Sequence, residues 1–419
     1  MTDELQQAVI FALSDGDDES SVEELKRLLD TAGAVCVETF IQRTDPESKT
    51  YIGSGKAKEI GLFCSANDIT LAVCNDELTP SQIKNLEDIM DGVEVIDRSM
   101  LILEIFKKHA VSAEGKLQVE IAELRYTVPR LIGKGAQLSR QGGGGGGGGG
   151  ARRGAGETKL ETDRRHVKHR IEYLKSQLEE LERTSNLKRH SRKRSGIPLV
   201  VVAGYTNAGK STLLNHLTGA GILAEDKLFA TLDTTTRKFT LPEGKEILLT
   251  DTVGFIQRLP HHLIKAFKST LDEVAYADVV IIVADASDSN CVRQLDVCEK
   301  LLSELSAGDK PTLYVFNKCD KAAELPEELA SSRFTPSVRI SAKTGEGTQS
   351  LCKALEDIVY GNIKTVRLLF PHSEGAMLSR LYKDGKVSDV SYTSDGTLVT
   401  AELSSEKIGI YSRFVTEDI

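Results

Sequence analysis

Residues 204–211 have the types and spacing of a phosphate-binding loop. The run Gly-Tyr-Thr-Asn-Ala-Gly-Lys-Ser fits GxxxxGK[ST], follows the apolar stretch Leu199–Ala203 and precedes a helical pattern, Thr212–Leu217. In such a unit, glycines let successive backbone N–H groups turn towards an anion, and the helix N-terminus adds positive potential. Lys210 would then reach the β- and γ-phosphates, and the Ser211 hydroxyl would ligate Mg²⁺. This pattern predicts a nucleoside triphosphate site.

Three further motifs, each after an apolar strand pattern, select the nucleotide. Asp251-Thr-Val-Gly254 offers a carboxylate that can hold Mg²⁺ through water and a glycine N–H for the γ-phosphate. In Asn317-Lys-Cys-Asp320, the last carboxylate can accept from both the ring N–H and the amine of guanine. Adenine has neither donor, so it would leave a buried carboxylate unpaired. Residues 341–343, Ser-Ala-Lys, suit the loop behind the base. GTP is therefore the predicted nucleotide.

A threonine-rich segment between the phosphate loop and Asp251 is expected to close on Mg²⁺ and the γ-phosphate. It runs Phe-Ala-Thr-Leu-Asp-Thr-Thr-Thr-Arg over residues 229–237. We favour Thr231 as the metal ligand, because it lies midway between Ser211 and Asp251. Thr235 is the alternative ligand, and an ordinary surface loop rich in threonine is the third interpretation.

The residue after the DxxG motif departs from Ras-like proteins, in which a glutamine there orients the attacking water. Here the position holds Phe255, which cannot hydrogen-bond to water. The hypothesis that follows is slow intrinsic hydrolysis that needs a partner to order the water. The expected catalytic residues are Lys210 and Gly254, and the expected metal ligands are Ser211 and Thr231. The expected nucleotide contacts are Gly204, Tyr205, Thr206, Asn207, Ala208, Gly209, Lys210, Ser211, Thr212, Phe229, Ala230, Thr231, Leu232, Asp233, Asp251, Thr252, Val253, Gly254, Asn317, Lys318, Cys319, Asp320, Ser341, Ala342 and Lys343.

The chain around this site is long enough for several domains. It has 419 residues, 40% of them hydrophobic and 27% charged, which is typical of a folded soluble protein. A net charge of −9 means that any nucleic-acid contact must come from a local basic patch. We expect a cytoplasmic protein, since no apolar run approaches the roughly 20 residues of a membrane helix and the N-terminus has no signal-peptide profile. The seven cysteines include no CxxC pair, which argues against a disulfide framework or a metal cage.

Two regions precede the nucleotide domain. Residues 1–98 alternate predicted strands with predicted helices, which favours a small α/β domain with a largely parallel sheet. The predicted strands are 34–40, 69–74 and 93–96, and the predicted helices are 20–29, 56–64 and 79–90. Residues 99–195 favour two long helices folded back antiparallel. Nine glycines, Gly142–Gly150, form the expected tip, and apolar residues from Val167 to Leu181 recur at 4-3-4-3 spacing.

The second of these helices is basic. Residues 151–195 contain 14 Lys or Arg against 7 Asp or Glu, in a chain that is acidic overall. A solvated linker helix and an RNA or ribosome contact are both compatible with this composition. The predicted fold is thus an α/β P-loop GTPase domain, 196–365, preceded by a small α/β domain, 1–98, and a long antiparallel helical hairpin, 99–195. A small C-terminal α+β domain, 366–419, completes it.

With these motifs placed, the chain resembles the HflX family of ribosome-associated GTPases. The similarity covers residues 35–370 and rests on several strings: YIGSGK at 51–56, DELTPSQ at 76–82, EGKLQVE at 114–120, and above all GETKLETDRR at 156–165. It implies a protein that binds the large ribosomal subunit in its GTP form and splits stalled or idle ribosomes, with hydrolysis allowing release. It implies rRNA contact through the basic hairpin and a monomer off the ribosome. A ribosome-assembly GTPase and a GTP-loaded regulatory recruiter with little catalysis stay open as alternatives.

Overall fold

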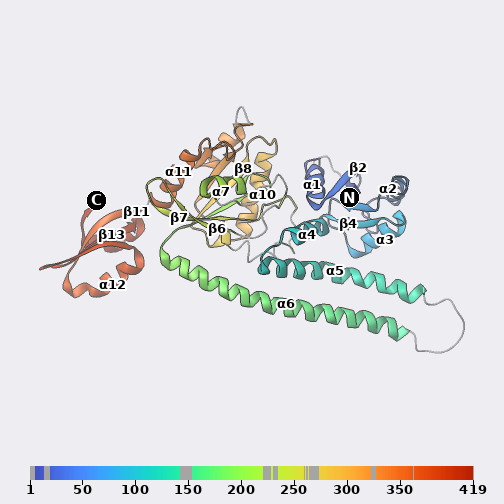
Figure 1. The fold of residues 1–419 in the computed structure, drawn as a ribbon, viewed down its shortest axis with the longest axis horizontal. Helices are drawn as coiled ribbons and strands as arrows, with labels where there is room; N and C mark the ends of the chain where they lie inside the picture. Colours follow the sequence, from blue (N-terminus) through green and yellow to red (C-terminus); the bar gives the residue numbers. More distant parts are fainter. Residues whose placement is uncertain are drawn as a thin grey trace.

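Three β-sheets and a pair of long helices make up the described part of the chain (Figure 1). The structure is a computed structural model, and it describes residues 5–13, 19–141, 153–219, 228–229, 235–258, 260, 263, 273–321, 327–361 and 363–418. The predicted α/β P-loop domain with further domains before it is confirmed. Among the described residues, no helix has the length and apolar content required to cross a membrane.

The N-terminal sheet has four parallel strands in the order β2-β1-β3-β4. Its strands are β1 (Gln6–Leu13), β2 (Ala34–Gln42), β3 (Leu71–Cys74) and β4 (Glu94–Asp97), and its helices are α1 (Glu19–Ala32), α2 (Ser54–Ala66), α3 (Pro80–Met90) and α4 (Arg98–His109). Strand β1, an inner strand of this sheet, was not predicted. Its six C-terminal residues are all buried, so they form a continuous apolar run without the alternation of a half-exposed strand.

Local sequence explains where α3 begins. The Thr79 hydroxyl accepts from the backbone N–H of Gln82, and the Gln82 amide oxygen accepts from the backbone N–H of Thr79. With Pro80 in the first turn, this capping box satisfies backbone groups that a helix start leaves unpaired.

The two long helices, α5 (Ala113–Gln141) and α6 (Arg153–Ser195), lie side by side (Figure 1). Leu174, in the predicted apolar stripe of α6, is buried, and Arg170 forms an ion pair with Glu120 of α5 at 2.7 Å. These contacts explain the 4-3-4-3 spacing, because one face of α6 packs on α5. The predicted tip, Gly142–Gly150, lies outside the described residues.

The third unit is a six-stranded sheet in the order β10-β9-β8-β5-β7-β6, with only β6 antiparallel to its neighbour. The strands are β5 (Leu199–Gly204), β6 (Thr236–Thr240), β7 (Glu246–Asp251), β8 (Val279–Asp285), β9 (Thr312–Asn317) and β10 (Ser337–Arg339). The named helices are α7 (Lys210–Thr218), α10 (Cys291–Glu304) and α11 (Thr348–Tyr360), with short 3₁₀ turns at Glu327–Ala330 and Ser332–Phe334. Strands β5, β7 and β9 each end at one of the predicted nucleotide motifs.

The C-terminal unit is an antiparallel sheet in the order β12-β13-β11-β14. It consists of β11 (Ile363–Phe370), β12 (Lys386–Thr393), β13 (Gly396–Ser404) and β14 (Val415–Asp418), the helices α12 (Gly375–Asp384) and α13 (Ser405–Tyr411), and 3₁₀ turns at His372–Glu374 and Ser412–Phe414. Its buried side chains form a core of their own. By contrast, a single apolar cluster joins α1 and α4 of the N-terminal unit to strands β5 and β8 of the nucleotide domain.

This separation of cores predicts independent stability for the C-terminal unit. Phe370 is 1% exposed and contacts Tyr411 and Phe414. A Phe370→Ala substitution should destabilise this unit by about 3–5 kcal/mol while leaving GDP affinity unchanged. Thermal unfolding measures the loss of stability, and a separate GDP titration measures the nucleotide affinity. A large loss of GDP affinity would show that the two cores are coupled.

Candidate nucleotide-binding site

The phosphate loop connects β5 to α7, and two of its glycines are required by the space around them. Gly204 has φ +146°, and a Cβ there would lie 2.2 Å from the carbonyl oxygen of Val283 on β8. Gly209 has φ +93°, and a Cβ would lie 2.2 Å from Nδ2 of Asn317. Both positions combine a left-handed backbone with a close neighbour, so larger side chains are excluded. The motif's glycines therefore let the loop pass between the strand ends.

Lys210 begins α7 with a buried side chain. Its ammonium donates to the carbonyl oxygens of Gly204, at 3.1 Å, and Tyr205, at 2.8 Å. Burial lowers the pKa of Lys210, while the nearby Asp251 opposes that shift. A cation with so little solvation is well suited to bind an anionic phosphate.

A pair of oxygen ligands lies beside the lysine. The Ser211 hydroxyl donates to Oδ2 of Asp251 at 2.9 Å, and Oδ1 of Asp251 accepts from the backbone N–H of Thr252 at 2.9 Å. A hydroxyl that donates its proton in this way keeps its lone pairs for coordination, and hydroxyl and carboxylate oxygens are ligands that Mg²⁺ prefers. These oxygen ligands thus fit a magnesium ion that would be held mainly by Ser211 and the nucleotide.

The predicted third component of the metal site cannot be placed in the same way. Thr231 lies outside the described residues, together with Ala230, Leu232 and Asp233. The alternative ligand, Thr235, is described, and its carbonyl oxygen accepts from the backbone N–H of Asp251 at 3.1 Å. Thr231 therefore stays the predicted ligand, with Thr235 as the alternative.

The DxxG segment lies directly on the phosphate loop. A Cβ at Gly254 would lie 2.6 Å from Cγ2 of Thr206 and 3.1 Å from Nζ of Lys210. Two backbone hydrogen bonds hold this arrangement: Phe255 N–H to the Gly204 carbonyl at 3.1 Å, and Thr206 N–H to the Phe255 carbonyl at 2.8 Å. The ring of Phe255 is 1% exposed. This position is therefore part of the core and offers no polar group to an attacking water.

Asn317 connects three loops of the site. Its Nδ2 donates to the carbonyl of Ala208 in the phosphate loop at 2.8 Å, and its Oδ1 accepts from the backbone N–H of Ala342 at 2.9 Å. Asp320 is exposed, and its pKa is lowered, first by a hydrogen bond from Ser341 and further by Lys343. The carboxylate therefore stays ionised at neutral pH, as a guanine acceptor must.

Other predicted residues have different surroundings. Lys318 has φ +61° and pairs with Asp285, at the end of β8, at 2.7 Å. Sequence reasoning missed Asp285, although an acidic residue ending a buried strand next to β9 was a usable signal. Phe229 was predicted to contact the nucleotide, but its ring is buried and packs edge-to-face on Phe106 of α4, with centroids 4.7 Å apart.

The predicted recognition of guanine by Asp320 leads to a substitution test. An Asp320→Asn variant should lose most of its preference for guanine and gain affinity for xanthine nucleotides, whose extra carbonyl suits an amide donor. Competition of GDP and XDP for a fluorescent nucleotide measures the change. An unchanged ratio of GDP to XDP affinity would contradict the base-reading role.

Three family models match consecutive parts of the chain. They are described as GTP-binding GTPase N-terminal over residues 19–107, GTP-binding GTPase middle region over 109–192, and 50S ribosome-binding GTPase over 199–318. Together they cover more than half of the sequence.

Individual relatives agree with these models. The GTPase HflX of Caldanaerobacter subterraneus subsp. tengcongensis is 46% identical over 403 residues, covering 96% of this chain and 92% of the relative. The GTPase HflX of Lacrimispora saccharolytica is 46% identical over 405 residues, covering 96% and 94%. A GTP-binding protein of Sulfolobus solfataricus, solved with GDP, is 26% identical, with a TM-score of 0.45 and coverage of 84% and 98%. The sequence matches, extending over nearly the whole chain, show that this protein is a GTPase of the HflX family.

Proposed function

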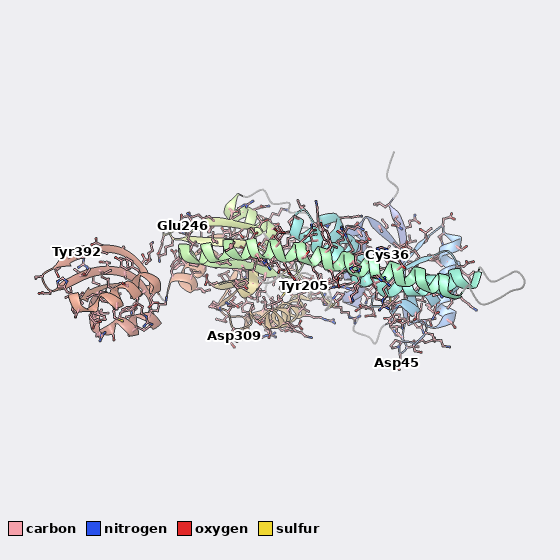
Figure 2. The ribbon with its side chains drawn as sticks, turned by 90° about the horizontal axis from the view of Figure 1, so that it is seen from below. Cys36, Asp45, Tyr205, Glu246, Asp309 and Tyr392 are labelled. Carbon is pink, nitrogen blue, oxygen red and sulfur yellow. The ribbon has the colours of Figure 1, made fainter. Side chains whose placement is uncertain are left out.

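We propose that this GTPase binds the large ribosomal subunit in its GTP-bound form and dissociates stalled or idle ribosomes into subunits, with hydrolysis driving release. The description of the family model over residues 199–318, a 50S ribosome-binding GTPase, supports the choice of partner. The observation that carries the proposal is the basic sequence of α6, a helix that runs from the nucleotide domain past the N-terminal unit (Figure 2).

Several cations of α6 are available for binding. Among the residues of this helix whose side chains the structure describes, Arg164, Arg165, Lys168, Lys175 and Arg183 are exposed, whereas Arg170 pairs with Glu120 of α5. Cations spaced along a rigid helix match the phosphates of a nucleic-acid backbone, and they bind through release of counterions. We infer that rRNA is the surface contacted by α6, with α5 and α6 acting as the binding hairpin.

The nucleotide site acts as the switch in this proposal. Lys210 and the loop amides neutralise phosphate charge, Ser211 and a threonine of 231–235 hold Mg²⁺, and Gly254 detects the γ-phosphate. Asn317 supports the loops, and Asp320 selects guanine. Because the buried Phe255 offers no hydrogen bond to water, we infer that hydrolysis is slow until the ribosome orders the attacking water.

The first test combines two measurements on the purified protein. GTP turnover with and without large ribosomal subunits should show strong stimulation, and sedimentation of intact ribosomes should show splitting in the presence of GTP. Stimulation without splitting would favour a ribosome-assembly GTPase acting on immature particles. Absence of any stimulation would reject the ribosome as the partner and leave a regulatory recruiter.

Two sets of variants distinguish the role of the nucleotide site from that of the cations on α6. Lys210→Ala should abolish nucleotide-dependent ribosome binding, because the phosphates lose their main cation. The double variant Arg165→Glu/Lys168→Glu should weaken ribosome binding at least tenfold and reduce its salt dependence, with GDP affinity unchanged.

The matched control is Lys58→Glu/Lys300→Glu, which makes the same charge change at exposed positions on α2 and α10. Cosedimentation with large subunits at several salt concentrations measures both effects. Equal losses in the test and control variants would mean that only net charge matters, and the assignment of α6 as the contact would be wrong.

A further inference from the structure

A buried ion pair in the N-terminal unit lies outside all the nucleotide motifs. The guanidinium of Arg98, which begins α4, pairs with the carboxylate of Glu24 on α1, and their side chains are 3% and 9% exposed. Arg98 also donates to Oδ1 of Asn75 at 3.1 Å and to the carbonyl of Ser21 at 3.3 Å. A charge pair this deeply buried is costly unless its remaining hydrogen-bonding groups are satisfied.

Some of these groups are satisfied by the nucleotide domain. Glu24 accepts from the hydroxyl of Tyr205, the second residue of the phosphate loop, and that hydroxyl accepts from the backbone N–H of Gln257 at 2.8 Å. Arg98 donates to the carbonyl of Gln257 at 3.3 Å. Both backbone groups of Gln257, three residues after Gly254, are therefore held by this network. In Figure 2, Tyr205 lies in the middle of the molecule, between the parts that carry Glu246 and Cys36.

Neighbouring contacts join the same two units. Arg258 forms an ion pair with Asp76, which follows β3. On the other side of the site, the backbone N–H of Leu228 donates to the hydroxyl of Thr31 on α1 at 3.2 Å. The N-terminal unit thus touches the chain just after the DxxG motif and just before the threonine-rich segment.

We propose that Glu24 and Arg98 are positioning residues for the nucleotide site: through Tyr205 and Gln257 they hold the DxxG segment against the phosphate loop, so that Gly254 is placed for the γ-phosphate. The geometry supports this role because two residues that closely follow Gly254, Phe255 and Gln257, are each held by hydrogen bonds. Phe255 is hydrogen-bonded to the phosphate loop, and Gln257 to the network. Gly254 lies close to the ammonium of Lys210, since a Cβ at Gly254 would lie 3.1 Å from Nζ of Lys210.

A consequence is that the γ-phosphate and the N-terminal unit are energetically coupled. A ligand that contacts Gly254 benefits from the network, whereas a diphosphate, bound by Lys210 and the loop amides, does not. By thermodynamic linkage, binding of a triphosphate must then tighten the contact between the two units by the same factor. This inference concerns nucleotide binding alone, so it can fail or succeed independently of the ribosome proposal.

The test removes one hydroxyl. Tyr205→Phe keeps the buried ring but deletes the group that connects Glu24 to Gln257. In Tyr205→Phe, the affinity for a non-hydrolysable GTP analogue should fall about fivefold more than the affinity for GDP, and kcat for GTP should fall as well. The matched control is Tyr314→Phe, because the Tyr314 hydroxyl likewise donates to a carboxylate, that of Glu299, at 2.7 Å but away from the phosphate loop.

The outcomes decide the proposal. An unchanged or increased ratio of analogue to GDP affinity in Tyr205→Phe, or an equal change in Tyr314→Phe, would overturn it. Glu24→Gln, which removes the charge and keeps an acceptor oxygen, should change the ratio in the same direction by a smaller factor. No change in Glu24→Gln would reject the contribution of the N-terminal unit.

Hydrogen exchange of backbone amides tests the coupling directly, because a purely structural role of the network would not make exchange depend on the nucleotide. In the unsubstituted protein, the GTP analogue should slow exchange in residues 19–32 of α1 more than GDP does. The difference should disappear in Tyr205→Phe. Identical exchange with the two nucleotides in the unsubstituted protein would contradict the coupling.

Discussion

The two hydrogen bonds of the Asn317 side chain are the constraint on which the site depends. One amide connects the loop after β9 to the phosphate loop through Ala208 and to the loop after β10 through Ala342. Because these loops come from separate strands, nothing local in the sequence fixes their spacing. The buried amide does so, and Gly209 must lack a side chain to let it approach. The segments predicted to bind the base and the phosphates are thereby held in one rigid frame.

Much of this frame could be predicted, because parallel strands place their carboxyl ends along one edge of the sheet. Once β5, β7 and β9 are recognised as apolar runs, their motifs have only one place to meet. The N-terminal sheet was harder. The six C-terminal residues of β1 are all buried, so its sequence lacks the alternation of a half-exposed strand, and the first strand predicted in the domain corresponds to β2.

Contacts between units could not be predicted at all. Glu24, Arg98 and Gln257 are far apart in the sequence and belong to no nucleotide motif, so their types alone do not indicate that they meet. Only the fold shows that they meet beside Tyr205. The same reason explains Phe229. Its neighbours in the sequence suggested a nucleotide contact but gave no sign that its apolar ring packs in the core shared with α4.

The length of α6 has a mechanical consequence. Its 43 residues extend about 64 Å at 1.5 Å per residue, and its last residue, Ser195, comes only four residues before β5 begins. A helix attached so close to a central strand would turn with that strand, together with α5 on which it packs, as a lever arm whose short end is the nucleotide domain. Each degree of rotation at its base moves the far end by about 1 Å. Changes too small to disturb the packing around the phosphates are thereby amplified to molecular dimensions at the other end.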